Sequence, residues 1–371
     1  MAPTQDVLYR DLELDLSWSE RELPERERTK HVHRLHPYLG KFIPQLVEAL
    51  LDRYFAPGQH VLDPFAGSGT TLVQALESRH DVTGVDIAAF NVLLASVKTR
   101  PYNLFVLERE LRDVVSRLDS LPRARARPTK YLREWFAPQA ARELLAFREL
   151  TREYEHVDVL AVVLARAARS ARLTTHFDLD FPREPQRGAY WCHKHKRECV
   201  PVESAQRFLR RYTLDTLARI KEFARLRARE AEAEMIHGDA RSIGFAHTFD
   251  AVVTSPPYPG LIDYHEQHRV AYELLGLEDL SGSEVGAARA GTSRAALDSY
   301  SAAVAEAIQN ARESLRRGAP IVIVVNARHD LYPGILARAG ARLEQRLRRH
   351  VNRRTGRRAG EFFEDILVAR A

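Results

Sequence analysis

Cysteine is scarce in this chain, with two residues out of 371. So low a count excludes a disulfide framework and favours a reducing compartment, so we expect a cytoplasmic protein. Long apolar stretches are also absent: a run such as 159–165 is far shorter than the roughly 20 residues that span a bilayer. The first residues, MAPTQDVLYRDLELD, are acidic and contain no apolar segment. We therefore expect neither a signal peptide nor a membrane partner.

Acidic residues are missing from two segments, 121–133 and 346–358, although the whole chain holds 50 of them. The first segment (LPRARARPTKYLR) carries five basic residues, and the second (RLRRHVNRRTGRR) carries seven arginines. The net charge is +6 and the pI is near 9.3. Such clusters suit a polyanion, because each neutralised phosphate releases counterions. The alternative is a protein that places arginine over all of its surface.

Alternating elements predict the fold class. Buried strands and helical stretches follow one another from residue 60 to 100 (HVLDPFAGSG, TTLVQALESR, DVTGVDI, FNVLLASVKTR). Strands resume with AEMIHGDA, FDAVVTSPPY and APIVIVVN, and two more, ARLEQRLRRHV and EFFEDILVA, lie near the C-terminus. The pattern predicts an α/β fold with a doubly wound, mostly parallel, Rossmann-like sheet. We expect an antiparallel C-terminal strand and a large, mainly helical insertion.

A glycine-rich loop, DPFAGSGTT at 63–71, lies between the first strand and the helix after it. Glycine there allows a ligand to approach the backbone, and the helix N-terminus offers free N–H groups. A nucleoside-triphosphate loop is excluded because no lysine follows the glycines. A dinucleotide fingerprint is disfavoured because Leu72 occupies its third glycine position.

The loop closely resembles the first motif of the amino-directed DNA methyltransferases, the N4-cytosine and N6-adenine enzymes. This resemblance implies S-adenosylmethionine as the cofactor. The loop would wrap its methionine part, and Asp86, which ends the next strand, would accept hydrogen bonds from the ribose hydroxyls. Asp239 would lie near the adenine, and the upstream segment at 42–44 would lie along the methionine end. The cofactor site then comprises Phe42, Ile43, Pro44, Asp63, Pro64, Phe65, Ala66, Gly67, Ser68, Gly69, Thr70, Thr71, Asp86, Ile87, Asp239 and Ala240. An isolated Asp86 or Asp239 could equally be a helix cap or a turn residue.

The segment TSPPY at 254–258 resembles the catalytic motif of the same family, [DNS]PP[YFW]. An exocyclic amine is a poor nucleophile because its lone pair is delocalised into the ring. The Ser255 hydroxyl and the Pro256 carbonyl would accept its two hydrogens, and Pro257 would help to hold that carbonyl rigid. Tyr258 would stack on the base after it is flipped out of the duplex. The alternative is a strand end capped by a Pro-Pro turn.

The positions of the cysteines and the first residue of the catalytic motif narrow the choice of the methylated atom. Methylation at cytosine C5 needs a nucleophilic cysteine, typically after a proline, and both cysteines lie in AYWCHKHKRECV. Serine as the first motif residue resembles the N4-cytosine branch, so we expect transfer to N4 of cytosine at a specific site in double-stranded DNA, as in restriction–modification systems. Alternatives are an N6-adenine enzyme, an RNA-base or protein-amide methyltransferase, and a DNA-binding pseudoenzyme. Partners could include a cognate restriction endonuclease, and the chain could be a monomer or a homodimer.

The pattern of elements divides the chain into three regions, whose roles follow from the same resemblance. Residues 1–104 form an N-terminal arm and the cofactor-binding half, and 231–371 form the catalytic half. Residues 105–230, too long for a plain loop, form the helical insertion and are the candidate target-recognition region. After the catalytic motif, Tyr264, His265 and Arg269 could line the base pocket, contact phosphate, or belong to a solvated helix face.

A cysteine–histidine cluster lies within the insertion. Cys192, His195 and Cys199 have usable zinc spacing, with His193 as a possible fourth ligand, but the run is compressed compared with usual structural sites. We favour a basic loop, flanked by aromatic residues, that contacts DNA phosphates, and we expect no metal.

Overall fold

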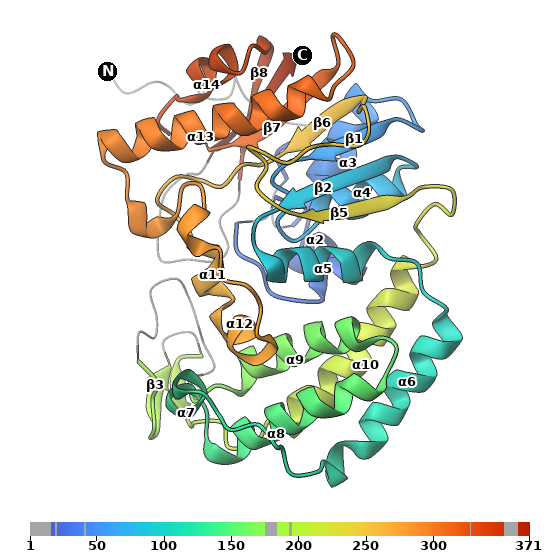
Figure 1. The fold of residues 1–371 in the computed structure, drawn as a ribbon, viewed down its shortest axis with the longest axis vertical. Helices are drawn as coiled ribbons and strands as arrows, with labels where there is room; N and C mark the ends of the chain where they lie inside the picture. Colours follow the sequence, from blue (N-terminus) through green and yellow to red (C-terminus); the bar gives the residue numbers. More distant parts are fainter. Residues whose placement is uncertain are drawn as a thin grey trace.

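One sheet organises the protein (Figure 1), of which the computed structural model describes residues 16–18, 21–40, 42–174, 184–192, 195–326, 328–351 and 363–371. The strand order is β5–β2–β1–β6–β7–β9–β8. Its first five strands pair in parallel, whereas β9 runs antiparallel to both β7 and β8. The strands are β1 (His60–Asp63), β2 (Asp81–Asp86), β5 (Ala233–His237), β6 (Ala251–Thr254), β7 (Pro320–Val325), β8 (Arg342–His350) and β9 (Phe363–Arg370). The predicted doubly wound α/β fold with an antiparallel C-terminal strand is confirmed.

The sheet is buried on both faces, which explains its continuous apolar strands. In β7 all six residues of PIVIVV are buried. Val322 and Val324 belong to one hydrophobic cluster, whereas Ile321 and Ile323 belong to the other. Side chains alternate between the two faces of a strand, so a single run such as this one supplies both cores.

Helices cover the two faces. On one face pack α3 (Pro44–Tyr54), α4 (Thr70–Glu77) and α5 (Ala89–Thr99), and on the other pack α13 (Arg294–Glu313) and α14 (Tyr332–Arg338). Figure 1 shows α13 and α14 at the top of the molecule and α5 on the opposite side of the sheet. Because β1 is followed by a helix on one face and β6 leads to a helix on the other, the winding reverses between β1 and β6.

The stretch predicted as a helical insertion is a layer of helices beyond α5 (Figure 1). Asn103 caps the first of them by accepting from Phe105 N and Val106 N, and Thr129 caps the next by accepting from Leu132 N. Leu111, Leu160 and Leu217 share a hydrophobic cluster with the sheet, so the layer packs directly on the α/β core. These helices are α6 (Leu104–Arg117), α7 (Lys130–Trp135), α8 (Pro138–Leu150), α9 (Val157–Ala171) and α10 (Gln206–Phe223).

Shorter elements complete the described chain. A two-stranded antiparallel hairpin, which the sequence pattern did not predict, joins β3 (Tyr190–Cys192) to β4 (Arg197–Cys199). The N-terminal segment carries α2 (Glu25–Arg28) and the 3-10 helix η2 (His31–Arg34), and α11 (Tyr264–Gln267) and α12 (Arg269–Leu275) follow β6. Within the part of the chain that the structure describes, no helix combines the length and apolar character that crossing a bilayer requires.

Candidate active site

A cavity of about 830 Å³, counting space open to solvent, lies at the carboxyl ends of the parallel strands. The loops that follow β1, β2, β5 and β6 all contribute to its wall, because parallel strands present their carboxyl ends at one edge of the sheet. The reversal between β1 and β6 is the place where open α/β sheets bind ligands. Predicted residues that line the cavity are Phe42, Pro64, Phe65, Ala66, Gly67, Ser68, Thr70, Asp86, Ile87, Asp239, Ala240, Ser255 and Pro257.

The other predicted site residues lie outside this lining. Asp63 and Thr71 are fully buried beneath the loop, and Gly69 is the N-cap of α4. Ile43 and Pro44 begin α3, where Pro44 is buried in the helix packing. Pro256 and Tyr258 lie in the loop after β6 but do not reach the cavity wall.

Two glycines give the loop after β1 its shape. Gly67 and Gly69 have φ of 50° and 76°, in the left-handed region that favours glycine. A Cβ on Gly67 would lie 2.9 Å from the Tyr38 hydroxyl oxygen, and one on Gly69 would lie 2.9 Å from Ala95 Cβ. Both distances are shorter than a Cβ atom makes with a non-bonded oxygen or carbon. The loop therefore requires glycine at both positions, for its backbone conformation and for the space available.

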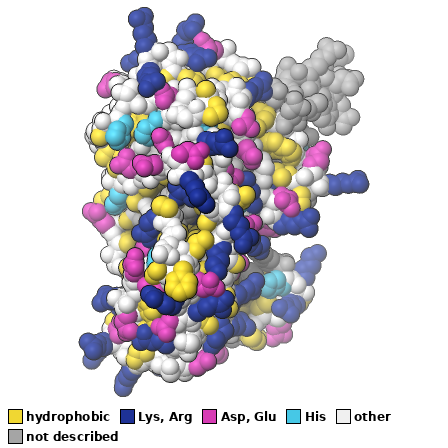
Figure 2. Space-filling view, turned by 90° about the vertical axis from the view of Figure 1, so that its right-hand side faces the viewer, with side chains coloured by type: hydrophobic (Ala, Val, Ile, Leu, Met, Phe, Trp, Pro, Cys, Tyr) yellow, Lys and Arg dark blue, Asp and Glu magenta, His cyan; other side chains and the backbone are white. Residues whose placement is uncertain are grey.

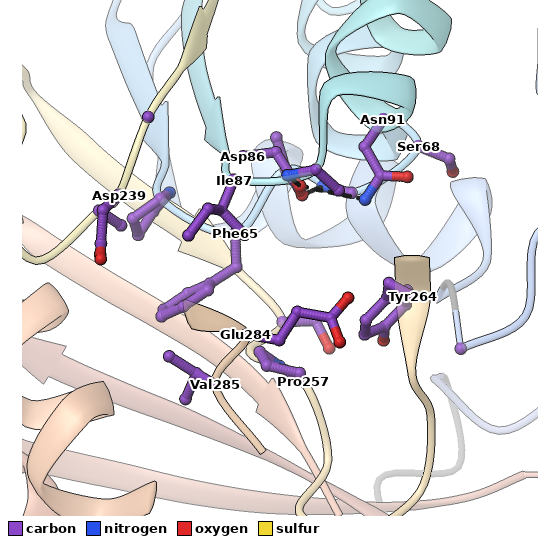
Figure 3. Close-up of a pocket in the computed structure, with 18 of the residues that line it drawn as sticks. Phe65, Ser68, Asp86, Ile87, Asn91, Asp239, Pro257, Tyr264, Glu284 and Val285 are labelled. Carbon is purple, nitrogen blue, oxygen red and sulfur yellow. Dashed lines mark hydrogen bonds between the residues drawn. The ribbon is translucent and has the colours of Figure 1, made fainter. Parts of the chain in front are cut away.

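Asp86 is held at the end of β2 by donors from its own surroundings. Its carboxylate accepts hydrogen bonds from Gly67 N and Ala88 N, both at 2.8 Å, and from Asn91 Nδ2 at 3.1 Å. Burial raises the pKa of Asp86, and these three hydrogen bonds oppose that rise by stabilising the charged form. Figure 3 shows Asp86, Asn91 and Ser68 along one side of the cavity. The carboxylate is therefore fixed in orientation while it borders the cavity.

Asp63 connects the two strand ends that carry the sequence motifs. Its Oδ1 accepts from Thr254 Oγ1 at 2.6 Å and from Phe65 N at 3.1 Å. Burial raises the pKa of Asp63 to about 6, although the hydrogen bonds from Thr254, Thr71 and Phe65 oppose that rise. The residue thus ties the end of β1 to the end of β6 from below the cavity.

Hydroxyl groups at the start of α4 remain available to a ligand. Ser68 Oγ and Thr70 Oγ1 are buried, line the cavity, and have no hydrogen-bond partner among the described residues. A buried hydroxyl without a partner costs free energy, so such groups call for a polar ligand. Because they stand at a helix N-terminus, the ligand that fits best carries negative charge, such as a carboxylate.

Asp239, unlike Asp86, is paired with an arginine side chain. Arg241 binds its carboxylate through Nε, at 2.9 Å and 3.0 Å from the two carboxylate oxygens, and this pairing lowers the pKa of Asp239. Both side chains line the cavity. Any ligand that uses Asp239 must share it with Arg241 or displace that guanidinium.

A buried ion pair stands behind the SPPY motif. The Tyr258 hydroxyl donates to Glu364 Oε1 at 3.1 Å, and the other oxygen of Glu364 accepts from Arg349 at 2.7 Å and 2.9 Å. Burial and the adjacent Glu364 carboxylate raise the pKa of Tyr258 well above its usual value. Tyr258 is therefore a neutral hydrogen-bond donor anchored to β9, while Ser255 and Pro257 face the cavity.

Most of the opposite wall comes from segments outside the two sequence motifs. Tyr38 and Tyr264 stack with ring centroids 5.7 Å apart, and Glu284 accepts from His265 Nδ1 at 2.5 Å. Figure 3 places Tyr264, Glu284 and Pro257 across the cavity from Asp86. Of the three residues flagged after the motif, Tyr264 lines the cavity, His265 is buried against Glu284, and Arg269 pairs with Glu273. Lining residues that the sequence analysis did not select as cofactor or catalytic residues are Tyr38, Gly40, Ala88, Asn91, Gly238, Arg241, Tyr264, Ser283, Glu284 and Val285.

The two basic segments differ in their surroundings. In 121–133 all five basic residues are exposed. In the other segment, Arg346 and Arg348 both pair with Asp365, and Arg349 pairs with Glu364 inside the protein. The expectation that the whole run 346–358 is available to phosphate is thus wrong for its first part, which serves the β8–β9 pairing; 352–358 lies outside the described residues. Figure 2 shows Lys and Arg interspersed with Asp and Glu over one face of the molecule.

Comparison with known proteins agrees with this geometry, which is that of a doubly wound α/β protein with a ligand cavity at its switch point. The sequence profile of the N6/N4 DNA methylase family matches residues 5–96. The chain is 33% identical, over 96% of its length and 82% of the relative's, to type II methyltransferase M.MjaII of Methanocaldococcus jannaschii. It is 21% identical to type II methyltransferase M.BsoBI of Geobacillus stearothermophilus, over 68% of this chain and 54% of that protein.

Among solved structures, the rRNA methyltransferase aviRa of Streptomyces viridochromogenes matches with 13% identity and a TM-score of 0.34, over 91% of this chain and 88% of that chain. A TehB-like SAM-dependent methyltransferase of Corynebacterium glutamicum matches with 11% identity and a TM-score of 0.32, over 87% and 85% of the two chains. The chain belongs to the type II DNA methyltransferases of the N6/N4 class, on the strength of its sequence relatives. Its methyl donor is S-adenosylmethionine.

Proposed function

We propose that this DNA methyltransferase transfers the methyl group to the N4 amine of cytosine, within a specific short sequence of double-stranded DNA. The proposal depends on the position of Ser255, which follows β6 and faces the same cavity as Gly67 and Asp86. Strand β6 lies next to β1, the strand that leads into the glycine loop. A serine hydroxyl accepts a hydrogen bond without adding charge, and the SPPY form resembles the cytosine branch of the family.

The cavity wall fits the cofactor. Asp86, fixed by three donors at the end of β2, would accept from the ribose hydroxyls. Ser68 and Thr70, whose buried hydroxyls have no partner among the described residues, would bind the methionine carboxylate at the start of α4. Asp239 would lie near the adenine, where Arg241 shares its carboxylate. Bound there, S-adenosylmethionine supplies an electrophilic methyl group on a sulfonium.

At the target base, this chain supplies hydrogen-bond acceptors. The Ser255 hydroxyl and the Pro256 carbonyl would accept the two hydrogens of the exocyclic amine, so that its lone pair is directed at the methyl group. Pro256 and Pro257 cannot donate to a neighbouring strand, and their fixed φ stiffens the loop. The acceptors are thereby oriented before the substrate arrives.

Tyr258 would stack on the flipped base. Stacking on an aromatic ring is worth about 1–3 kcal/mol per base, which offsets part of the cost of unstacking it from the duplex. In the free protein the ring lies outside the cavity lining and its hydroxyl is tethered to Glu364. Stacking would therefore require the base to reach past Ser255, or the loop after β6 to shift.

The helical layer formed by 105–230 would recognise the target sequence, and exposed basic residues of 121–133 would contact phosphates. The 121–133 segment leads into α7, and α7 in turn contacts α12, the helix that follows the cavity residue Tyr264. A duplex bound at the cavity could thus meet this layer with its backbone. A cognate restriction endonuclease would recognise the same sequence.

The proposal is tested by expressing the chain in cells that lack DNA methylation, and digesting their DNA to nucleosides for mass spectrometry. We expect N4-methylcytosine, at a strongly reduced level in cells that express Ser255→Ala. Methylation-sensitive sequencing of the same DNA then gives the target site. N6-methyladenine as the product would refute the choice of base but not the class of enzyme. C5-methylcytosine would refute the assigned chemistry altogether.

A further inference from the structure

The β3–β4 hairpin brings together both cysteines of the chain and His195, none of which lines the cavity. Each of its strands has three residues, and both strands lie outside the main sheet. Figure 1 shows β3 at the lower left of the molecule, away from the main sheet. A hairpin this short is marginally stable alone, so it needs support from packing or from a cross-link.

The hairpin turn converts close sequence spacing into a cluster. Cys192 pairs across the hairpin with Arg197, and Cys199 pairs with Tyr190, so the two cysteines lie at opposite ends of the ladder. Because side chains alternate along a strand, both thiols lie on the same face of the hairpin, diagonally across it. Lys196 has φ of 51°, which turns the chain back after His195. One ligand atom from each of Cys192, His195 and Cys199 lies within 4.8 Å of the others, and His195 Nδ1 lies 3.3 Å from Cys199 Sγ.

This convergence outweighs the expectation, drawn from the compressed sequence spacing, that no metal binds here, and we propose that Cys192, His195 and Cys199 bind a zinc ion. Bond lengths of about 2.3 Å to sulfur and about 2.0 Å to nitrogen place the ligand atoms of a tetrahedral zinc roughly 3.5–3.8 Å apart, so the observed cluster needs only small adjustments. Two thiolates and an imidazole form a donor set that binds zinc in preference to magnesium or calcium. The fourth position of the tetrahedron is left to water or to a further ligand.

Burial divides the cluster in a way that suits a structural ion. Cys192 is 2% exposed and lies outside both main hydrophobic clusters, whereas Cys199 is half-buried and His195 is exposed. An ion there would join both strands of the hairpin to His195 in its exposed turn. Trp191, 57% exposed, would then project from a fixed strand, as would the adjacent basic residues that we expect to meet DNA.

The test measures metal, not methylation. The full chain is expressed with zinc in the medium, purified under reducing conditions, dialysed, and analysed by elemental mass spectrometry. We expect about one zinc per chain. Cys192→Ser and Cys199→Ser should each lose it, whereas Glu198→Gln, a change in the same hairpin to a residue outside the cluster, should retain it.

A second measurement does not depend on how the variants fold. Wild-type chain stripped with a chelator is titrated with Co²⁺, and a thiolate-to-cobalt charge-transfer band saturating near one equivalent is expected. Three outcomes would overturn the site: wild-type chain without metal and without the cobalt band, zinc retained in both cysteine variants, or an intact mass two hydrogens short, which means a Cys192–Cys199 disulfide. None of them bears on the proposed methyl transfer, because the hairpin lies away from the cavity.

Discussion

Replacing Gly67 tests whether the loop after β1 holds the cofactor by its backbone shape. Gly67 has φ of 50°, and its N–H donates to Asp86. An added Cβ would stand 2.9 Å from the hydroxyl oxygen of Tyr38, which itself accepts from Asn91 at 3.1 Å. Alanine therefore disturbs the conformation of the loop and a contact in the cavity wall at once.

The magnitude follows from the two effects. A left-handed conformation costs an L-residue about 1–2 kcal/mol, which the free loop can relieve by changing its backbone angles but the cofactor-bound loop cannot. That cost falls on binding, and since about 1.4 kcal/mol is tenfold, Gly67→Ala should weaken S-adenosylmethionine binding by roughly 5- to 30-fold. Displacement of Tyr38 adds to this loss. Gly67→Val, whose branched Cβ is a true outlier at positive φ, should abolish measurable binding.

Calorimetric titration of wild type, Gly67→Ala and Gly67→Val with S-adenosylmethionine measures the effect, and thermal unfolding shows that each variant folds. Gly58→Ala is the matched control: Gly58 has φ of 85°, an added Cβ there meets nothing within 4 Å, and the residue lies outside the cavity. It should lose stability but keep its affinity. Undiminished affinity in Gly67→Val would remove the loop from the site, and an equal loss in Gly58→Ala would show that backbone strain acts globally.

Four further outcomes are expected. Ser255→Ala should lower the single-turnover rate by about 10²–10³-fold with cofactor affinity unchanged, and a wild-type rate would leave TSPPY no catalytic role. Tyr258→Phe should keep most of the rate, since the ring remains, but denaturant unfolding should show a loss of about 1–2 kcal/mol from the missing bond to a carboxylate. Burial raises the pKa of Asp63 to about 6, so between about pH 4 and pH 6 the folded protein binds a proton that the unfolded chain has lost. The unfolding free energy of wild type, measured relative to Asp63→Asn, should therefore fall by up to about 3 kcal/mol as pH rises from about 4 to about 6, and then level off. A difference that does not change with pH would refute the raised pKa. Replacing the four arginines of 353–358 with alanine should weaken binding to any DNA and flatten its salt dependence, whereas Arg346→Ala, which breaks an ion pair within the protein, should leave the salt slope unchanged.

The sequence could predict the sheet because its strands carry their own signal. PIVIVV and HVLD are continuous apolar runs, and the residues after HVLD are types that end a strand and admit a ligand. The order of motifs along alternating elements then places Gly67, Asp86 and Ser255 at one edge, as the structure has them. That deduction requires only local pattern and the rule that parallel strands end together.

The remaining features depend on contacts between distant segments. Tyr38 and Glu284 meet at the cavity although 246 positions separate them, and neither was selected as a cofactor or catalytic residue from the sequence. The arginines of β8 looked free because the cross-strand register is invisible in the sequence. In the structure Arg348 lies opposite Asp365 and Arg349 opposite Glu364, so the charges are neutralised across the sheet.

The loop after β6 is fastened on both sides. Before it, Thr254 donates to Asp63 at the end of β1, which fixes the distance between the serine of TSPPY and the glycine loop. After it, Tyr258 donates to Glu364 on β9, and Arg349 holds that carboxylate from β8. The Thr254–Asp63 anchor is buried and the Tyr258–Glu364 anchor is partly buried, and hydrogen bonds to a carboxylate are strong in such surroundings. A loop so held orients its acceptors before DNA arrives, so loosening the Thr254–Asp63 anchor, which lies next to Ser255, should reduce the rate of methyl transfer more than the affinity for the cofactor.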